Sequence, residues 1–106
     1  MGQAYATMVA TVETSNFLFG QPTTGNSSAV QLTSDSQNLF HGVWLSPKSA
    51  ATYFIGKSDV DATNGIVLYR GSTVSDNLIH IPCTDASQIY VINGDGAGKV
   101  ISWMAV

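Results

Sequence analysis

Apolar and polar residues alternate in short runs along the chain, and most runs end in residues that form turns. The clearest pair of runs covers 52–57 and 66–70, on either side of the polar loop 59–65. Alternation with a period of two is typical of half-buried β-strands, and a polar loop between two such runs predicts a strand–turn–strand unit. Further runs of this kind lie at 3–14, 29–33, 39–45, 78–81, 88–92 and 99–106.

About eight short strands at regular spacing, with no credible long helix, predict an all-β protein. The expected fold is a single antiparallel β-sandwich of the jelly-roll or immunoglobulin-like sort. The whole chain, residues 1–106, is expected to form this one domain. The order of the strands within the sheets does not follow from the pattern.

Two segments between these runs carry expectations of their own. Residues 15–28 are rich in turn formers and predict a loop. The apolar residues Phe17, Leu18 and Phe19 lie within it, either as a short strand or as an exposed patch. We name them as the candidate intersubunit contact, with ordinary core packing as the alternative. Residues 93–98 read Asn-Gly-Asp-Gly-Ala-Gly and predict a hairpin loop, because Asn-Gly and Asp-Gly favour the positive φ of primed turns.

The chain is unusually poor in charge, which bears on the class of protein. Charged residues make up 10% of the sequence, against about 25% in a typical soluble domain. Ser, Thr, Asn, Gln and Gly must cover much of the surface, which suits a β-protein in a crowded assembly better than a free cytosolic enzyme. The formal net charge of −3 gives no basic footprint for nucleic acid, and no apolar run is long enough to span a membrane.

Asp59 and Asp61 are the carboxylate pair that most resembles a metal site. A calcium site needs several converging oxygen ligands, commonly at alternating positions. Counted from Asp59, the glycine position of an EF-hand holds Asn64 and its final acidic position holds Arg70, so an EF-hand is excluded. An irregular calcium site stays open. We expect instead an Asx-type turn without a metal, in which side-chain oxygens bond nearby backbone N–H groups.

The remaining side chains that could carry chemistry are expected to be structural. His41 and His80 fall in predicted strands, as wall or core residues with a hydrogen-bond partner, because zinc needs three or four ligands and Cys83 is the only thiol. Cys83 is expected to be a small buried apolar residue. Trp44 and Trp103 are expected to anchor the core or an interface, with stacking on sugars as the alternative. The residue types of a Ser-His-Asp triad are present, but the GxSxG nucleophile motif is not, and no residue is assigned a catalytic role.

Three sequence segments in the C-terminal two-thirds of the chain together resemble those of a known class of proteins. They read QLTSDSQNLFHGVWLSP, YFIGKSDVDATNGIVLYRG and IHIPCTDASQIYVINGDGAGKVISWMAV, and they lie within Gln31–Val106. This succession resembles a class of small virion proteins of tailed bacteriophages. In that class a strand–loop–strand unit like the second segment precedes a Gly-rich loop and a last apolar strand. The Ala-rich N-terminal third and Phe17–Phe19 lie outside the resemblance.

The resemblance implies a non-enzymatic structural protein of the virion that needs no cofactor. The role it favours is capsid decoration, in which a cement protein on the capsid surface binds and stabilises the shell of the major capsid protein. It also implies contacts with copies of itself, commonly as a homotrimer, and no nucleic-acid or membrane partner. The alternative is a tail or fibre component that acts as a receptor- or carbohydrate-binding module. A small hydrolase or metal-dependent enzyme is disfavoured.

Overall fold

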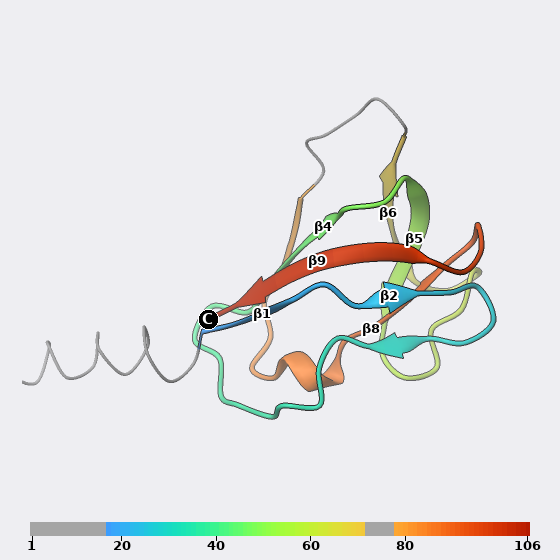
Figure 1. Ribbon diagram of the computed structural model, residues 1–106. Coiled ribbons are helices and arrows are strands. Elements are labelled where there is room, and N and C mark those ends of the chain that lie inside the picture. The colour runs from blue at the N-terminus through green and yellow to red at the C-terminus, as the bar shows by residue number, and fades with distance from the viewer. Residues whose placement is uncertain (1–16, 72–77) are drawn as a thin grey trace, which may run out of the picture.

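The computed structural model describes residues 17–71 and 78–106, and these residues form a β-sandwich (Figure 1). Two antiparallel sheets pack against one another, which confirms the all-β prediction. The predicted strand at 3–14 lies outside the described residues. The strands in the two described ranges are β1 (Leu18–Gly20), β2 (Thr23–Thr24), β3 (Val30–Gln31), β4 (Val43–Pro47), β5 (Ala51–Gly56), β6 (Ile66–Arg70), β7 (Ile79–Ile81), β8 (Tyr90–Asn93) and β9 (Lys99–Ala105), with a short 3₁₀ helix, η1 (Ala86–Gln88), before β8.

Each sheet is built around one long central strand. The β9 sheet has the strand order β1-β9-β4-β7, and β2 pairs with the beginning of β9. The β5 sheet has the order β3-β8-β5-β6. In Figure 1 the red strand β9 runs across the front of the molecule, with β1 and β2 along one of its edges. The predicted strand–turn–strand unit is confirmed, because β5 and β6 pair as an antiparallel hairpin around the polar loop.

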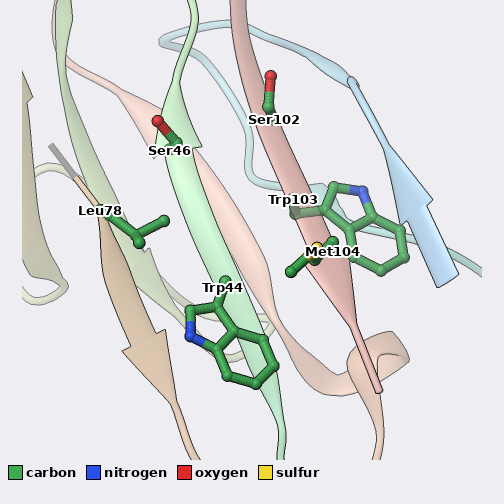
Figure 2. Close-up of a pocket in the computed structure, with 6 residues that line it drawn as sticks. All are labelled: Trp44, Ser46, Leu78, Ser102, Trp103 and Met104. Atoms are coloured by element: carbon green, nitrogen blue, oxygen red, sulfur yellow. The ribbon is translucent and has the colours of Figure 1, made fainter. Parts of the chain in front are cut away.

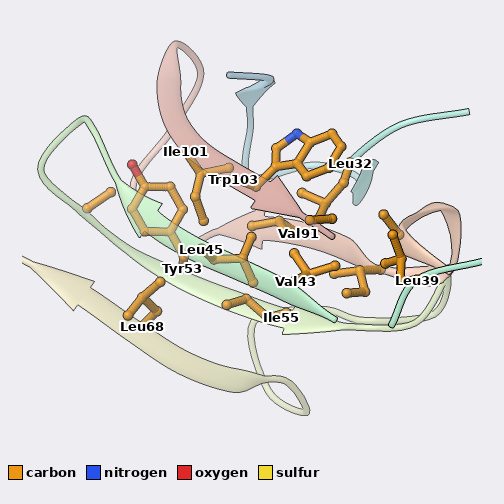
Figure 3. Close-up of a cluster of buried hydrophobic side chains, with 14 residues drawn as sticks. Leu32, Leu39, Val43, Leu45, Tyr53, Ile55, Leu68, Val91, Ile101 and Trp103 are labelled. Carbon is orange, nitrogen blue, oxygen red and sulfur yellow. The ribbon is translucent and has the colours of Figure 1, made fainter. Parts of the chain in front are cut away.

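The hydrophobic core fills the space between the two sheets (Figure 3). Buried and partly exposed residues alternate strictly along β4 and β5, as the period of two in the sequence predicts. Val43, Leu45, Tyr53 and Ile101 have no exposed surface at all. Burying one such apolar side chain contributes about 1.5–3 kcal/mol, so these inward positions hold the two sheets together.

The prediction of a strand over 39–45 is wrong at its start, because β4 begins only at Val43. Gly42 has a φ of 110°, which breaks the extended backbone. The amides of residues 40–42 all donate to the carbonyl oxygen of Val106, at 2.7 to 3.2 Å. This segment therefore wraps the end of β9 instead of extending β4.

Two predicted connections also differ from the structure. The segment 15–28 is a loop only in part, since it contains β1 and β2, and both pair with β9. The segment 93–98 is not a hairpin, because β8 ends in the β5 sheet and β9 begins in the β9 sheet. Positive φ angles occur at Gly96 and Gly98 and not at Gly94, so Asn-Gly does not form the primed turn. The segment instead carries the chain across the sandwich.

Tyr53 gives the core a pH-dependent contact, which yields a first prediction. Its buried hydroxyl donates to the carbonyl oxygen of Ser49 at 2.7 Å, with that of Val100 also within reach at 3.0 Å. Tyr53→Phe is expected to lower the free energy of unfolding by about 1 kcal/mol at neutral pH. Burial raises the pKa of Tyr53 above 10.0, because the phenolate would lose its hydration.

The raised pKa fixes the sign of the pH dependence. Folded Tyr53 stays protonated at a pH where the unfolded chain loses this proton. The contribution of its hydroxyl to the free energy of unfolding is therefore complete below pH 10.0 and declines as the pH rises through the pKa of the folded state. Urea unfolding of the parent chain and Tyr53→Phe across this range measures the effect. A difference between the two proteins that does not shrink above pH 10.0 would contradict it.

Candidate functional site

The residues Phe17, Leu18 and Phe19 lie at β1, and the structure divides them between two environments. Leu18 is opposite Ala105 and packs against the core. Phe19 is opposite Met104 and points outward, with 76% of its surface exposed. Phe17 is 47% exposed, and its ring lies 6.0 Å from that of Phe19. The core alternative is thus correct for Leu18, while the two phenylalanines form an exposed pair whose role as an intersubunit contact stays a prediction.

A close contact with Trp103 seats β1 on the sandwich. Gly20 pairs with Trp103, and a Cβ atom at Gly20 would lie only 2.8 Å from the indole Nε1. Trp103 is 6% exposed and belongs to the core, which is one of the two positions expected for the tryptophans. Because β1 rests on this ring without a side chain in between, the outward position of Phe19 is fixed by a core residue.

The outward side chains of the β9 sheet form a row across four strands. Phe19 is opposite Met104, Met104 is opposite Trp44, and Trp44 is opposite His80. Leu78, just before β7, adds an apolar side chain that is 66% exposed, and Met104 is 43% exposed. We call this surface the apolar outer face and define it by Phe17, Phe19, Trp44, Leu78 and Met104. A large exposed apolar patch on a soluble protein commonly marks a site of interaction with another molecule, whereas single exposed apolar residues do not.

The apolar outer face is hollowed between β4, β7 and β9 (Figure 2). The cavity has a volume of about 240 Å³ and opens widely to the surface. This volume is below the range of roughly 300–1,000 Å³ that is typical of small-molecule sites. The hollow therefore suits one or two side chains of a protein partner better than it suits a small-molecule ligand. Its lining residues are Trp44, Ser46, Leu78, Ser102, Trp103 and Met104.

His80 lies beside Trp44 of this hollow, and its ring contacts the backbone of His41. The His80 ring stacks on Trp44, with centroids 4.3 Å apart and planes inclined by 19°. Its Nε2 lies 2.6 Å from the carbonyl oxygen of His41, and since a carbonyl can only accept, Nε2 carries the proton. Both histidines are exposed, so the core alternative is wrong, and His41 precedes β4 instead of lying in a strand. The predicted hydrogen-bond partner is confirmed for His80.

The loop between β5 and β6 is the Asx-type turn that the sequence predicts. The Asp61 carboxylate accepts hydrogen bonds from the hydroxyl and the backbone N–H of Thr63. These bonds hold the pKa of Asp61 below its ordinary value. The Asn64 side chain closes the turn by accepting from the Asp61 amide at 2.8 Å and donating to the Asp59 carbonyl at 3.2 Å. The side-chain oxygens of Asp61 and Asn64 therefore accept hydrogen bonds from the loop's own backbone, while the exposed Asp59 carboxylate lies 4.0 Å from the Lys57 ammonium group.

Asn93 organises the crossing between the sheets and was not singled out from the sequence. Its side chain is fully buried, and Oδ1 accepts from the amides of Asp95 and Gly96, both at 2.8 Å. Its Nδ2 donates to the Thr24 hydroxyl at 2.8 Å, and that hydroxyl donates to the carbonyl oxygen of Lys99 at 2.7 Å. This network is structural, because it ties the 93–98 segment to β2 and to the start of β9.

Three further features concern the described ranges 17–71 and 78–106, namely metal binding, a membrane-spanning helix and the thiol of Cys83. No three His, Cys, Asp or Glu side chains lie close enough there to hold a metal ion. In the same ranges, no helix is both long and apolar enough to cross a membrane. Cys83 is partly buried and packs against the core, close to the expectation of a small buried apolar residue, and burial raises the pKa of its thiol.

Sequence reasoning missed two members of the apolar outer face as surface residues, Leu78 and Met104, and it left Trp44 open between the core and an interface. A signal was present, because the run 99–106 is apolar at both alternating sets of positions. A strand that is apolar on both sides has either two buried faces or one face left for a partner. Comparison with known proteins adds no further identification, because no protein-family model, no curated protein and no solved structure matches the chain.

Proposed function

We propose that this chain is a structural protein of a virion that decorates the capsid by binding the shell of the major capsid protein through the apolar outer face. The observation that carries the proposal is this face itself, where Phe17 and Phe19 are exposed and the exposed side chains of Leu78 and Met104 line a hollow. The resemblance of Gln31–Val106 to small virion proteins of tailed bacteriophages supports the class of partner.

The composition of the face matches that of a protein-binding surface. Interface cores are enriched in aromatic residues and Met and are depleted of Lys, Glu and Asp. Among the described residues, the apolar outer face contains Phe17, Phe19, Trp44 and Met104 and no acidic residue or lysine. Ser46 and Ser102 line the hollow and offer hydroxyl groups beside the apolar side chains. Apolar burial would supply most of the binding free energy, and the chain would act as a cement between neighbouring capsid subunits.

The proposal includes a non-enzymatic role without a cofactor. Three ionisable side chains that could serve a reaction, those of Asp61, Asp85 and His80, have structural contacts in this fold. The carboxylates of Asp61 and Asp85 accept hydrogen bonds from Thr63 and Ser87 within their own turns. The His80 ring is held between Trp44 and a backbone carbonyl.

Acidic substitutions on the face test the proposal. Phe19→Glu combined with Met104→Glu is expected to weaken binding to capsid shells by about 30-fold or more, because two central contacts are lost and charges are buried. Co-sedimentation with shells prepared without the chain measures the affinity, and circular dichroism verifies that the variant folds. Ala62→Glu is the control, since it adds the same charge at an exposed position of the loop between β5 and β6.

Equal binding of the double variant and Ala62→Glu would overturn the role of the apolar outer face. The number of copies in purified virions tests the location on the particle. We expect a number comparable to that of the major capsid protein. A few copies per particle would contradict capsid decoration and favour a tail or fibre component that binds a receptor or carbohydrate.

A further inference from the structure

The strand β6 forms the longest free sheet edge among the described residues. It pairs with β5 along one side, and no strand in ranges 17–71 and 78–106 pairs with its other side. β6 has five residues, whereas the other terminal strands of the two sheets have three in β1 and β7 and two in β3. A longer free edge offers more unpaired backbone groups to another strand.

β6 lacks the features that usually protect an edge strand. Natural edges carry lysines, prolines or bulges that discourage pairing. β6 reads Ile-Val-Leu-Tyr-Arg, and three of its apolar side chains are 57–59% exposed. Its one charged side chain, Arg70, donates from Nη1 to the carbonyl oxygens of Pro47 and Lys48. The positive charge is thus directed back to the end of β4.

We propose that a second copy of the chain pairs with this edge, β6 against β6, in an antiparallel arrangement. Centred on Leu68, such a pair places Val67 opposite Tyr69 of the other copy, twice by symmetry. Aromatic and β-branched residues opposite each other stabilise antiparallel strands. Ile66 falls opposite Arg70, so no like charges face each other. The edge is therefore complementary to itself in sequence.

The geometry of this pairing limits the assembly to two copies, in contrast to the homotrimer that the resemblance implies. Each copy has one β6, and a strand pair related by a two-fold axis uses both free edges and closes. The two β5 sheets then become one continuous sheet. The apolar outer face belongs to the other sheet, so self-association does not depend on capsid binding and does not compete with it directly.

The pair is expected to form reversibly and to depend on concentration. Two strands of five residues bury less surface than a stable interface of roughly 1,200–2,000 Å². Placing copies side by side on a larger particle would raise their effective concentration and favour the pair.

Sedimentation equilibrium of the full chain over a range of concentrations tests the proposal. The mass is expected to rise from 11.2 kDa toward twice that value, with amide hydrogen exchange slowing in β6 as the pair forms. Val67→Glu with Tyr69→Glu puts like charges opposite each other and should weaken association at least about tenfold. Val67→Lys with Tyr69→Glu puts opposite charges in the same places and should associate more tightly than the double-glutamate variant. Phe40→Glu, at a residue with the same 57% exposure, is the control and should leave association unchanged.

Three results would overturn the proposal. The first is a mass that stays at that of one copy, and the second is a mass that approaches three copies. The third is association that is equal in both charge variants, since the register on Leu68 requires them to differ. If the double-glutamate variant fails to fold, the comparison of Val67→Lys/Tyr69→Glu with the parent chain, together with hydrogen exchange in β6, still decides the question.

Discussion

Gly42→Ala is expected to lower the free energy of unfolding by about 3–5 kcal/mol, which is a large part of the roughly 5–15 kcal/mol that stabilises a typical domain. Gly42 has a φ of 110°, a conformation that L side chains rarely adopt. A Cβ atom there would also lie 2.2 Å from the carbonyl oxygen of Ile81 and 2.9 Å from the Cα of Pro82. Both contacts are with backbone, so rotation of a side chain cannot relieve them.

The position of Gly42 makes relaxation costly. It precedes β4 directly, and its amide and carbonyl both bond to Val106 at 3.2 Å. Moving this backbone away from Ile81 would disturb the pairing of β4 with β7, where Val43 is opposite Ile81. The substitution must therefore either strain the local backbone or separate two strands of the β9 sheet.

Alanine substitutions at two other glycines distinguish the effect of backbone strain from that of the steric clash. Gly96 has a φ of 141° but open space around its Cα, so Gly96→Ala should cost only the strain, about 1–2 kcal/mol. Gly25 has neither a positive φ nor a neighbour within 4 Å, so Gly25→Ala should change stability by less than about 0.5 kcal/mol. Urea unfolding of the three variants measures the series. Equal unfolding midpoints for Gly42→Ala and Gly96→Ala would mean that the steric clash at Gly42 contributes nothing to the loss of stability.

Local patterns were sufficient to predict the sandwich and the β5–β6 hairpin. The alternation in 52–57 and 66–70 lies on either side of a loop whose hydrogen bonds are almost all made within five residues, such as those of Asp61 with Thr63 and Asn64. Such contacts follow from the nearby sequence alone. The hairpin and the Asx-type turn were therefore predicted correctly from side-chain chemistry and period.

Long-range contacts decided the elements that were predicted wrongly. The amide of His41 bonds to Val106, which is far along the chain, so the alternation at 39–45 could not reveal where β4 begins. The hairpin prediction for 93–98 failed for a similar reason. Asn93 resembles a turn residue, yet its partner Thr24 lies 69 residues away in β2 and holds it in the interior.

The candidate surface was predicted only at one end. Phe17 and Phe19 were proposed because they interrupt a polar segment, and both are exposed. Met104 and Trp44 lie in strands whose two alternating sets of side chains are both largely apolar. The sequence alone does not show which of the two sets faces the core. That choice is made by register, because Phe19, Met104 and Trp44 are adjacent only after β1, β9 and β4 pair.

Asn93→Ala is expected to lower the free energy of unfolding by about 2–4 kcal/mol, because it removes three hydrogen bonds from a buried site. The amides of Asp95 and Gly96 would lose their acceptor, and the Thr24 hydroxyl would lose one donor. A cavity would also remain where the side chain is now fully buried. Chemical unfolding monitored by tryptophan fluorescence measures the loss, and Thr23→Ala, at the exposed neighbour of Thr24, is the control.

A double-mutant cycle shows whether the network acts as a unit. Thr24→Val keeps the shape of the side chain but removes the hydroxyl that joins Asn93 to the Lys99 carbonyl. If the bonds are connected, the combined variant should be less destabilised than the sum of the single variants by about 0.5–3 kcal/mol. Additive effects would mean that Asn93 stabilises only the 93–98 segment and does not tie it to β2. Coupling would instead identify this buried contact as the link that positions β8, β2 and the start of β9 at one end of the sandwich.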